Sequence, residues 1–190
     1  NSPRYALMLY SKRITCVFVT CHQSLASVPG SLTPGRVLEV AGLLHEALMG
    51  IRGKLPSLGL LALNPHAGEG GLFGREEIEI LLPAVEAARR AGIQISDPIP
   101  PDTAFLAEAL ARYDGYVCLY HDQGGIPFKM LSFEDGVNTT LGLPVVRTSV
   151  DHGTAFDIAW QGRASSSSLV AAAGLAVQLI GQRKNMPGHQ

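Results

Sequence analysis

The sequence has 190 residues, which suits a single domain, and such a chain buries roughly 70% of the surface that its unfolded form would expose. Hydrophobic residues make up 46% of the chain and charged residues 16%, which excludes an intrinsically disordered protein. The 15 basic and 16 acidic side chains give a formal net charge of -1, which argues against a nucleic-acid partner.

The three cysteines are Cys16, Cys21 and Cys118, and their spacing matches neither a disulfide framework nor a cysteine-rich metal site. A reducing compartment fits them best, so we expect a cytoplasmic protein. The longest apolar runs fall short of the ~20 residues that cross a bilayer, so we expect no membrane segment. The chain starts with Asn-Ser-Pro, without an initiator Met or a signal-peptide pattern, which is compatible with a fragment.

Gly and Pro divide the chain into short apolar runs that alternate with amphipathic ones, which predicts an α/β fold. Residues 5–10 and 14–20 are predicted to be two strands joined by a tight turn. Thr33 and Pro34 predict the start of a helix, because Thr can cap free amides and Pro needs no donor there. Its apolar positions recur at steps of three and four residues. They are Val37, Leu38, Ala41, Leu44, Leu48 and Ile51.

Residues 58–63 are a continuous apolar run, typical of a strand covered on both faces, and a glycine-rich loop follows at 64–71. A helix is predicted at 75–91, with a kink at Pro83. Its early glutamates and late arginines complement the helix dipole. These are Glu76, Glu77, Glu79, Arg89 and Arg90. Further strands are predicted at 93–95, 116–120 and 145–150, further helices at 103–112 and 165–180, and a frayed tail after Gly181.

Three of the six histidines lie just beyond the ends of predicted strands: His22, His66 and His121. Ligands of open α/β sheets gather beyond the carboxyl ends of the strands, so these imidazoles are candidates for one site. Three neutral imidazoles leave positions on a metal ion vacant, as a catalytic ion requires. The alternative is that each histidine is a hydrogen-bonded structural residue, because histidines far apart in sequence have no diagnostic spacing.

Lys129, Asn138 and Arg147 offer a cation, an amide and a guanidinium, which together suit an anionic substrate. The alternative is a solvated Lys129 and an Arg147 that pairs with a carboxylate. The small residues of the loop at 64–71 would let its backbone approach a ligand. The loop matches neither a phosphate-binding loop nor a dinucleotide fingerprint, so an ordinary strand-to-helix turn is the alternative.

Four strings carry a resemblance to a known family. They are LNPHAGEGG at 63–71, PDTAF at 101–105, YHDQG at 120–124 and GVNTTLGLPVVRTSVDHGTA at 136–155. The chain, from about residue 4 to residue 181, resembles the C-terminal part of the 4-hydroxythreonine-4-phosphate dehydrogenase family. The resemblance implies an α/β/α sandwich of the isocitrate/isopropylmalate dehydrogenase type that lacks its N-terminal part. Residues 1–190 would then be the metal-, substrate- and NAD-binding portion of a two-lobed dehydrogenase.

The resemblance also implies roles for single residues. The implied ligands of a divalent metal (Zn, Mg or Co) are His22, His66 and His121. The implied substrate contacts are Lys129, Asn138 and Arg147. The implied catalytic residues are Asp102, Asp122 and Lys129. A string that starts at His152 is similar to the cofactor loop of the isocitrate and isopropylmalate dehydrogenases, which implies NAD or NADP. The implied cofactor residues are His152, Gly153, Thr154, Ala155 and Asp157.

The reaction implied is the oxidation, with decarboxylation, of 4-phosphooxy-threonine in pyridoxal 5'-phosphate (vitamin B6) biosynthesis, by a homodimer with its active site at the interface. Gln23 and Ser24 depart from the usual Leu-Pro or Ile-Pro after His22, and Trp160 departs from the usual Gly. Alternatives are therefore a relative that acts on 4-phospho-threonate, on 4-phospho-erythronate or on an aromatic cis-dihydrodiol carboxylate, and an inactive truncated fragment that dimerises.

Overall fold

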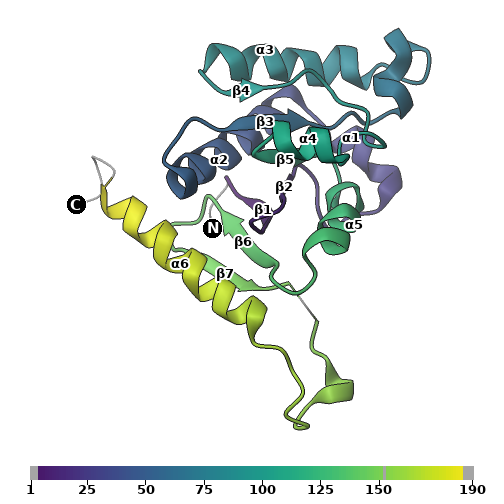
Figure 1. The fold of residues 1–190 in the computed structure, drawn as a ribbon. Coiled ribbons are helices and arrows are strands. Elements are labelled where there is room, and N and C mark those ends of the chain that lie inside the picture. Colours follow the sequence, from purple (N-terminus) through teal and green to yellow (C-terminus); the bar gives the residue numbers. More distant parts are fainter. Residues whose placement is uncertain (1–3, 152, 186–190) are drawn as a thin grey trace.

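A mixed seven-stranded sheet organises the computed structural model, which describes residues 4–151 and 153–185 (Figure 1). The strands are β1 (Ala6–Tyr10), β2 (Thr15–Phe18), β3 (Ser57–Leu60), β4 (Gln94–Ile95), β5 (Gly115–Cys118), β6 (Val137–Leu141) and β7 (Arg147–Val150). Their order across the sheet is β4-β3-β5-β2-β1-β6-β7. The four strands from β4 to β2 run parallel, whereas each of the pairs β2-β1, β1-β6 and β6-β7 is antiparallel.

Helices lie on both faces of this sheet, which confirms the predicted α/β/α arrangement. They are α1 (Val28–Ser31), α2 (Pro34–Arg52), α3 (Leu82–Arg90), α4 (Ala107–Arg112), α5 (His121–Ser132) and α6 (Ser167–Asn185). Short 3-10 segments are η1 (Leu25–Ser27), η2 (Pro65–Gly71) and η4 (Phe156–Ile158), and η3 (Glu77–Leu81) is π-helical. In the described part of the chain, no helix is both long enough and apolar enough to cross a bilayer.

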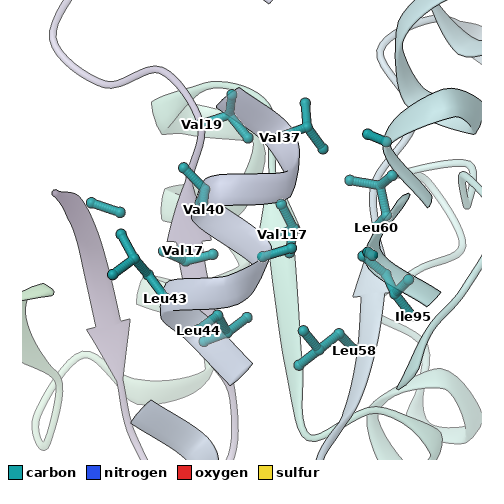
Figure 2. Packing of buried hydrophobic residues seen from close by; sticks show 14 of the residues in the cluster. Val17, Val19, Val37, Val40, Leu43, Leu44, Leu58, Leu60, Ile95 and Val117 are labelled. Carbon is teal, nitrogen blue, oxygen red and sulfur yellow. The ribbon is translucent and has the colours of Figure 1, made fainter. Parts of the chain in front are cut away.

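The larger part of the core lies between the sheet and α2 (Figure 2). The side chain of Thr33 caps α2 by accepting a hydrogen bond from the amide of Arg36 at 3.1 Å, as predicted. Val37 and Leu44 of α2 are buried against strand side chains such as Val17 and Val117. Alternate strand residues point to opposite faces, so Cys16 and Phe18 of β2 belong instead to the cluster beneath Phe128 of α5.

Two elements beyond the predicted ones complete the sheet and the second face. Residues 121–132 form α5 although they include two adjacent glycines and Pro127, which have low helix propensity. Residues 137–141 form β6, which pairs with β1 from Ala6↔Leu141 to Tyr10↔Val137. Packing of α5 on β2 and β5, and pairing of β6 with β1, outweigh these weak local preferences.

Several predicted boundaries are corrected. The helix predicted at 75–91 contains the π-helical η3, in which the amide of Leu82 reaches the carbonyl of Glu77, just before Pro83. Pro83 has no amide hydrogen for an ordinary helical bond, which accounts for an irregularity at this point. The helix predicted at 103–112 is shortened to α4, and α6 continues past Gly181 instead of fraying there.

Candidate metal and substrate site

Two of the three predicted metal ligands, His22 and His121, lie side by side. His22 lies shortly after β2, and His121 is the first residue of α5, separated from the end of β5 by two residues. Parallel pairing of β2 with β5 therefore brings both histidines to one end of the sheet. Their ring centroids are 5.5 Å apart. Both side chains line a cavity of about 560 Å³, together with Cys21, Tyr120 and Asp122.

The imidazole of His121 is held from two sides. Its Nδ1 hydrogen-bonds Oδ1 of Asp122 at 2.7 Å, and its ring stacks on the ring of Phe18 with centroids 5.5 Å apart. A carboxylate on one ring nitrogen fixes the tautomer and orientation of a metal-ligating histidine, and it leaves the other nitrogen, Nε2, for the metal. His121 is therefore oriented as a metal-ligating histidine would be, with its Nε2 free to face His22 and a cation. Asp122, a predicted catalytic residue, is placed to orient His121.

The next two residues of the YHDQG string fix the strand ends. Gln123 is buried, and it accepts a hydrogen bond from the amide of Leu119 and donates one to the carbonyl of Ala62, both at 2.7 Å. It thereby ties the segment after β5 to the segment after β3. A Cβ on Gly124 would lie 2.5 Å from Sγ of Cys118, so glycine allows α5 to approach the sheet. Sequence reasoning missed both residues, although an amide and a glycine right after a buried strand were the available signal.

The third predicted ligand, His66, lies on the exposed loop that follows β3. Its ring neighbours that of Phe73, at 6.2 Å between centroids, and it does not line the cavity of His22 and His121. Within residues 4–151 and 153–185, no three His, Cys, Asp or Glu side chains are grouped so that they could hold a metal ion. One chain thus brings together two of the three predicted ligands.

A buried carboxylate supports the start of the His66 loop. Oε1 of Glu77 accepts hydrogen bonds from the amides of Leu63 and Asn64, each at 2.8 Å, and Oε2 accepts one from Nδ2 of Asn64 at 2.9 Å. Burial acts to raise the pKa of Glu77, but the hydrogen bonds from the side chain and the backbone outweigh it and lower the pKa. Glu77 therefore remains an ionised acceptor at neutral pH. The sequence had suggested only a favourable charge near a helix start.

Two of the three predicted substrate residues, Asn138 and Arg147, line a second cavity of about 740 Å³ together with His22. Oδ1 of Asn138 is buried and has no hydrogen-bond partner among the described residues. Arg147 donates from Nη1 to Oγ1 of Thr140 at 3.2 Å, and Thr140 lines the same cavity. Arg147 thus hydrogen-bonds a hydroxyl rather than the carboxylate that the alternative interpretation required.

The other predicted site residues lie elsewhere. Lys129 on α5 and Asp102 before α4 are exposed, and neither lines the two cavities that contain His22. His152 lies outside the described residues. Gly153, Thr154, Ala155 and Asp157 belong to the segment that projects between β7 and α6 (Figure 1). In this segment Ala155 has a left-handed backbone with φ of 47°, and Trp160 is fully exposed.

His22 and His121 lie beyond the carboxyl ends of the neighbouring parallel strands β2 and β5, which is where open α/β sheets bind their ligands. The model of one family, the pyridoxal phosphate biosynthetic protein PdxA, matches residues 1–176. The chain belongs to this family, which confirms the resemblance seen in its motifs.

Two curated relatives illustrate the similarity. A 4-hydroxythreonine-4-phosphate dehydrogenase of Desulforapulum autotrophicum is 52% identical over 177 residues, which are 93% of this chain and 52% of that protein. A D-threonate 4-phosphate dehydrogenase of Salmonella typhimurium is 46% identical over 179 residues, or 94% of this chain and 55% of that protein. The chain spans about half the length of the curated relatives it matches.

A solved structure supports the fold directly. The crystal structure of 4-hydroxythreonine-4-phosphate dehydrogenase from Klebsiella pneumoniae superimposes with a TM-score of 0.82 at 45% sequence identity. The match covers 95% of this chain and 54% of that one. The described fold is therefore the fold of about half of this relative.

Proposed function

We propose that residues 1–190 are the metal-, substrate- and NAD-binding portion of a longer, two-lobed, NAD(P)-dependent dehydrogenase that oxidises and decarboxylates 4-phosphooxy-threonine in pyridoxal 5'-phosphate biosynthesis. The observation that carries this proposal is the pairing of His22 with His121 in one cavity, with Asp122 on Nδ1 of His121. Membership of the PdxA family supports the reaction class. The cytoplasmic location stays a prediction.

The metal site is proposed to be shared by two copies of the chain. His22 and His121 supply two imidazoles, and catalytic zinc sites usually have three protein ligands. His66 is exposed beside Leu72 and Phe73, apolar side chains that are 73% and 49% exposed and are suited to burial against another chain. His66 of a partner would then complete the site, which makes the protein a homodimer with the active site at the interface.

A divalent ion bound there would act as a Lewis acid on the substrate hydroxyl. The residues of this chain bind and orient the substrate beside it. Arg147, itself held by Thr140, would pair with an anionic group of the substrate, and the amide of Asn138 would bind a polar group. NAD or NADP, as hydride acceptor, is assigned to the segment of Gly153, Thr154, Ala155 and Asp157, with His152. Catalytic roles for Asp102, Asp122 and Lys129 stay predictions.

The second candidate function is oxidation of a phosphorylated threonate or erythronate by the same site. Gln23, which departs from the family pattern, lines the cavity of Asn138 and Arg147. Its Nε2 donates hydrogen bonds to Oγ of Ser27 and Oγ of Ser31, both at 2.9 Å, so a polar network borders the substrate cavity at this point. The 46% identical relative is named for D-threonate 4-phosphate, which supports this alternative.

Calorimetric titration of the chain with zinc tests the shared metal site. We expect near-stoichiometric binding that is lost in His66→Ala and in His121→Ala. An equimolar mixture of these two variants should recover about one site per mixed dimer, or about half a site per dimer when chains pair at random, because one chain supplies His22 and His121 and the other supplies His66. Zinc binding that survives in His66→Ala would contradict the proposed ligand set, and loss without recovery in mixed dimers would contradict the shared site.

The substrate requires a separate measurement. NAD and NADP reduction should be compared for phosphorylated threonine, threonate and erythronate, with the protein at its full natural length. Highest kcat/KM for 4-phosphooxy-threonine supports the first candidate function, whereas highest kcat/KM for a threonate or an erythronate supports the second. Absence of turnover with all three would contradict both.

A further inference from the structure

The loop that carries His66 has an unusual backbone. The five consecutive residues 66–70 all have positive φ, between 44° and 78°. Two of them are glycines, but His66, Ala67 and Glu69 are not, and this left-handed conformation is unfavourable for residues with a side chain. Such a run persists only where surrounding structure holds it in place. The support for this loop is therefore part of how His66 is presented.

The contacts of Glu77 provide that support at two points. Its carboxylate receives the amides of Leu63 and Asn64, the residues through which the chain leaves β3 and enters the loop. At Gly68, in the middle of the left-handed run, an added Cβ would lie 2.7 Å from Oε2 of Glu77. The backbone of the loop thus rests against the same carboxylate that binds its entrance.

Glu77 is itself fixed to a rigid element. It is 4% exposed and starts η3, which continues into α3, and α3 contributes Ala84 and Val85 to the main core. The neighbouring Glu79 is exposed and pairs instead with Arg75 on the same helical turn. Two glutamates close together in sequence therefore differ in role, because one faces the loop and the other faces solvent.

We propose that Glu77 is a positioning residue for His66: its carboxylate binds the entrance of the left-handed loop and lies against Gly68 in the middle of it, which holds the imidazole where a metal ion can use it. Glu77 touches neither metal nor substrate in this scheme. The inference rests on the proposed role of His66 as a metal ligand, and it adds a residue that acts through the loop backbone.

The test compares Glu77→Gln with Glu79→Gln, which makes the same chemical change on the exposed side of the helix. Zinc affinity is measured by calorimetry, and Co²⁺ visible spectra report the coordination geometry. We expect Glu77→Gln to weaken zinc binding about 10- to 100-fold and to alter the Co²⁺ spectrum, as loss of an outer support of a metal ligand does. Glu79→Gln should leave both unchanged. Hydrogen exchange of the amides of residues 64–71 in the metal-free chain should accelerate only in Glu77→Gln.

The hydrogen-exchange measurement separates this inference from the proposed function. Failure of the wild-type chain to bind zinc would contradict the proposed metal site, whereas the exchange rates would still decide whether Glu77 holds the loop. Equal exchange rates and equal zinc affinity in the two variants would overturn the inference. It would also be overturned if Glu77→Gln accelerated hydrogen exchange throughout the chain as much as in residues 64–71. If Glu77→Gln fails to fold, Asn64→Ala removes one donor to the carboxylate and should show a smaller effect in the same direction.

Discussion

Gly124 determines how closely α5, with His121 at its first residue, can approach the sheet. A Cβ at this position would lie 2.5 Å from Sγ of Cys118 and 3.1 Å from Cβ of Cys16, and both cysteines are fully buried. Overpacking of a core usually costs about 1–3 kcal/mol. Replacing a glycine inside a helix by alanine raises the free energy of unfolding by about 0.5–1 kcal/mol through helix propensity alone. We therefore expect Gly124→Ala to lower the free energy of unfolding by about 1–2 kcal/mol.

Gly174 of α6 provides the matched control, because an added Cβ there would have no atom within 4 Å beyond its chain neighbours and the backbone of its own helix. The helix propensity then acts alone, and Gly174→Ala should raise the free energy of unfolding by up to about 1 kcal/mol. Urea unfolding followed by circular dichroism measures both variants, with the slope m expected to stay constant. The packing argument is refuted if Gly124→Ala is as stable as the wild type or more stable.

Three other features have measurable consequences. Thr33→Ala removes the cap of α2 and should lower the free energy of unfolding by about 1 kcal/mol, which thermal or urea unfolding would detect. The pKa of Glu77 is lowered in the folded chain, so its carboxylate stabilises the fold at neutral pH and loses this effect as the pH falls below about 4. Unfolding measured from pH 7 to pH 3 should therefore depend less on pH in Glu77→Gln than in Glu79→Gln. Cys16 and Cys118 are buried, and only Cys21 is partly exposed. A thiol reagent should therefore label one cysteine in the native chain and all three in urea. Fast labelling of all three cysteines in the native chain would contradict the burial of Cys16 and Cys118.

Much of the fold follows from the sequence because buried strands and amphipathic helices leave clear apolar patterns. The hairpin of β1 and β2, the helix α2 and the buried strand β3 were predicted from such patterns. The strand β6 was missed because its sequence, VNTTL, mixes polar residues into a strand that is only alternately buried. The helix α5 was missed because its two glycines and Pro127 have low helix propensity, and the close packing against the sheet that Gly124 allows leaves no such sequence pattern.

The candidate site was predictable to the extent that it depends on strand ends. The sequence predicted that each histidine follows a strand, and the structure shows that His22 and His121 meet because β2 and β5 are parallel neighbours. The position of His66 was not predictable, because it depends on a left-handed turn and on the carboxylate of Glu77. Charge pattern alone assigns Glu77 to a helix surface, whereas the structure buries it against backbone amides.

The antiparallel pairing of β1 with β6 joins residues 6–10 to residues 137–141. During synthesis on the ribosome, β1 can form its hairpin with β2 early, but its other edge stays open until β6 has emerged. An open strand edge is a site for pairing with the wrong chain, and closing a contact over such a sequence distance slows folding. The late-emerging β6 therefore covers the second edge of β1, and a nascent chain stalled before it would expose an edge on which aggregation can begin.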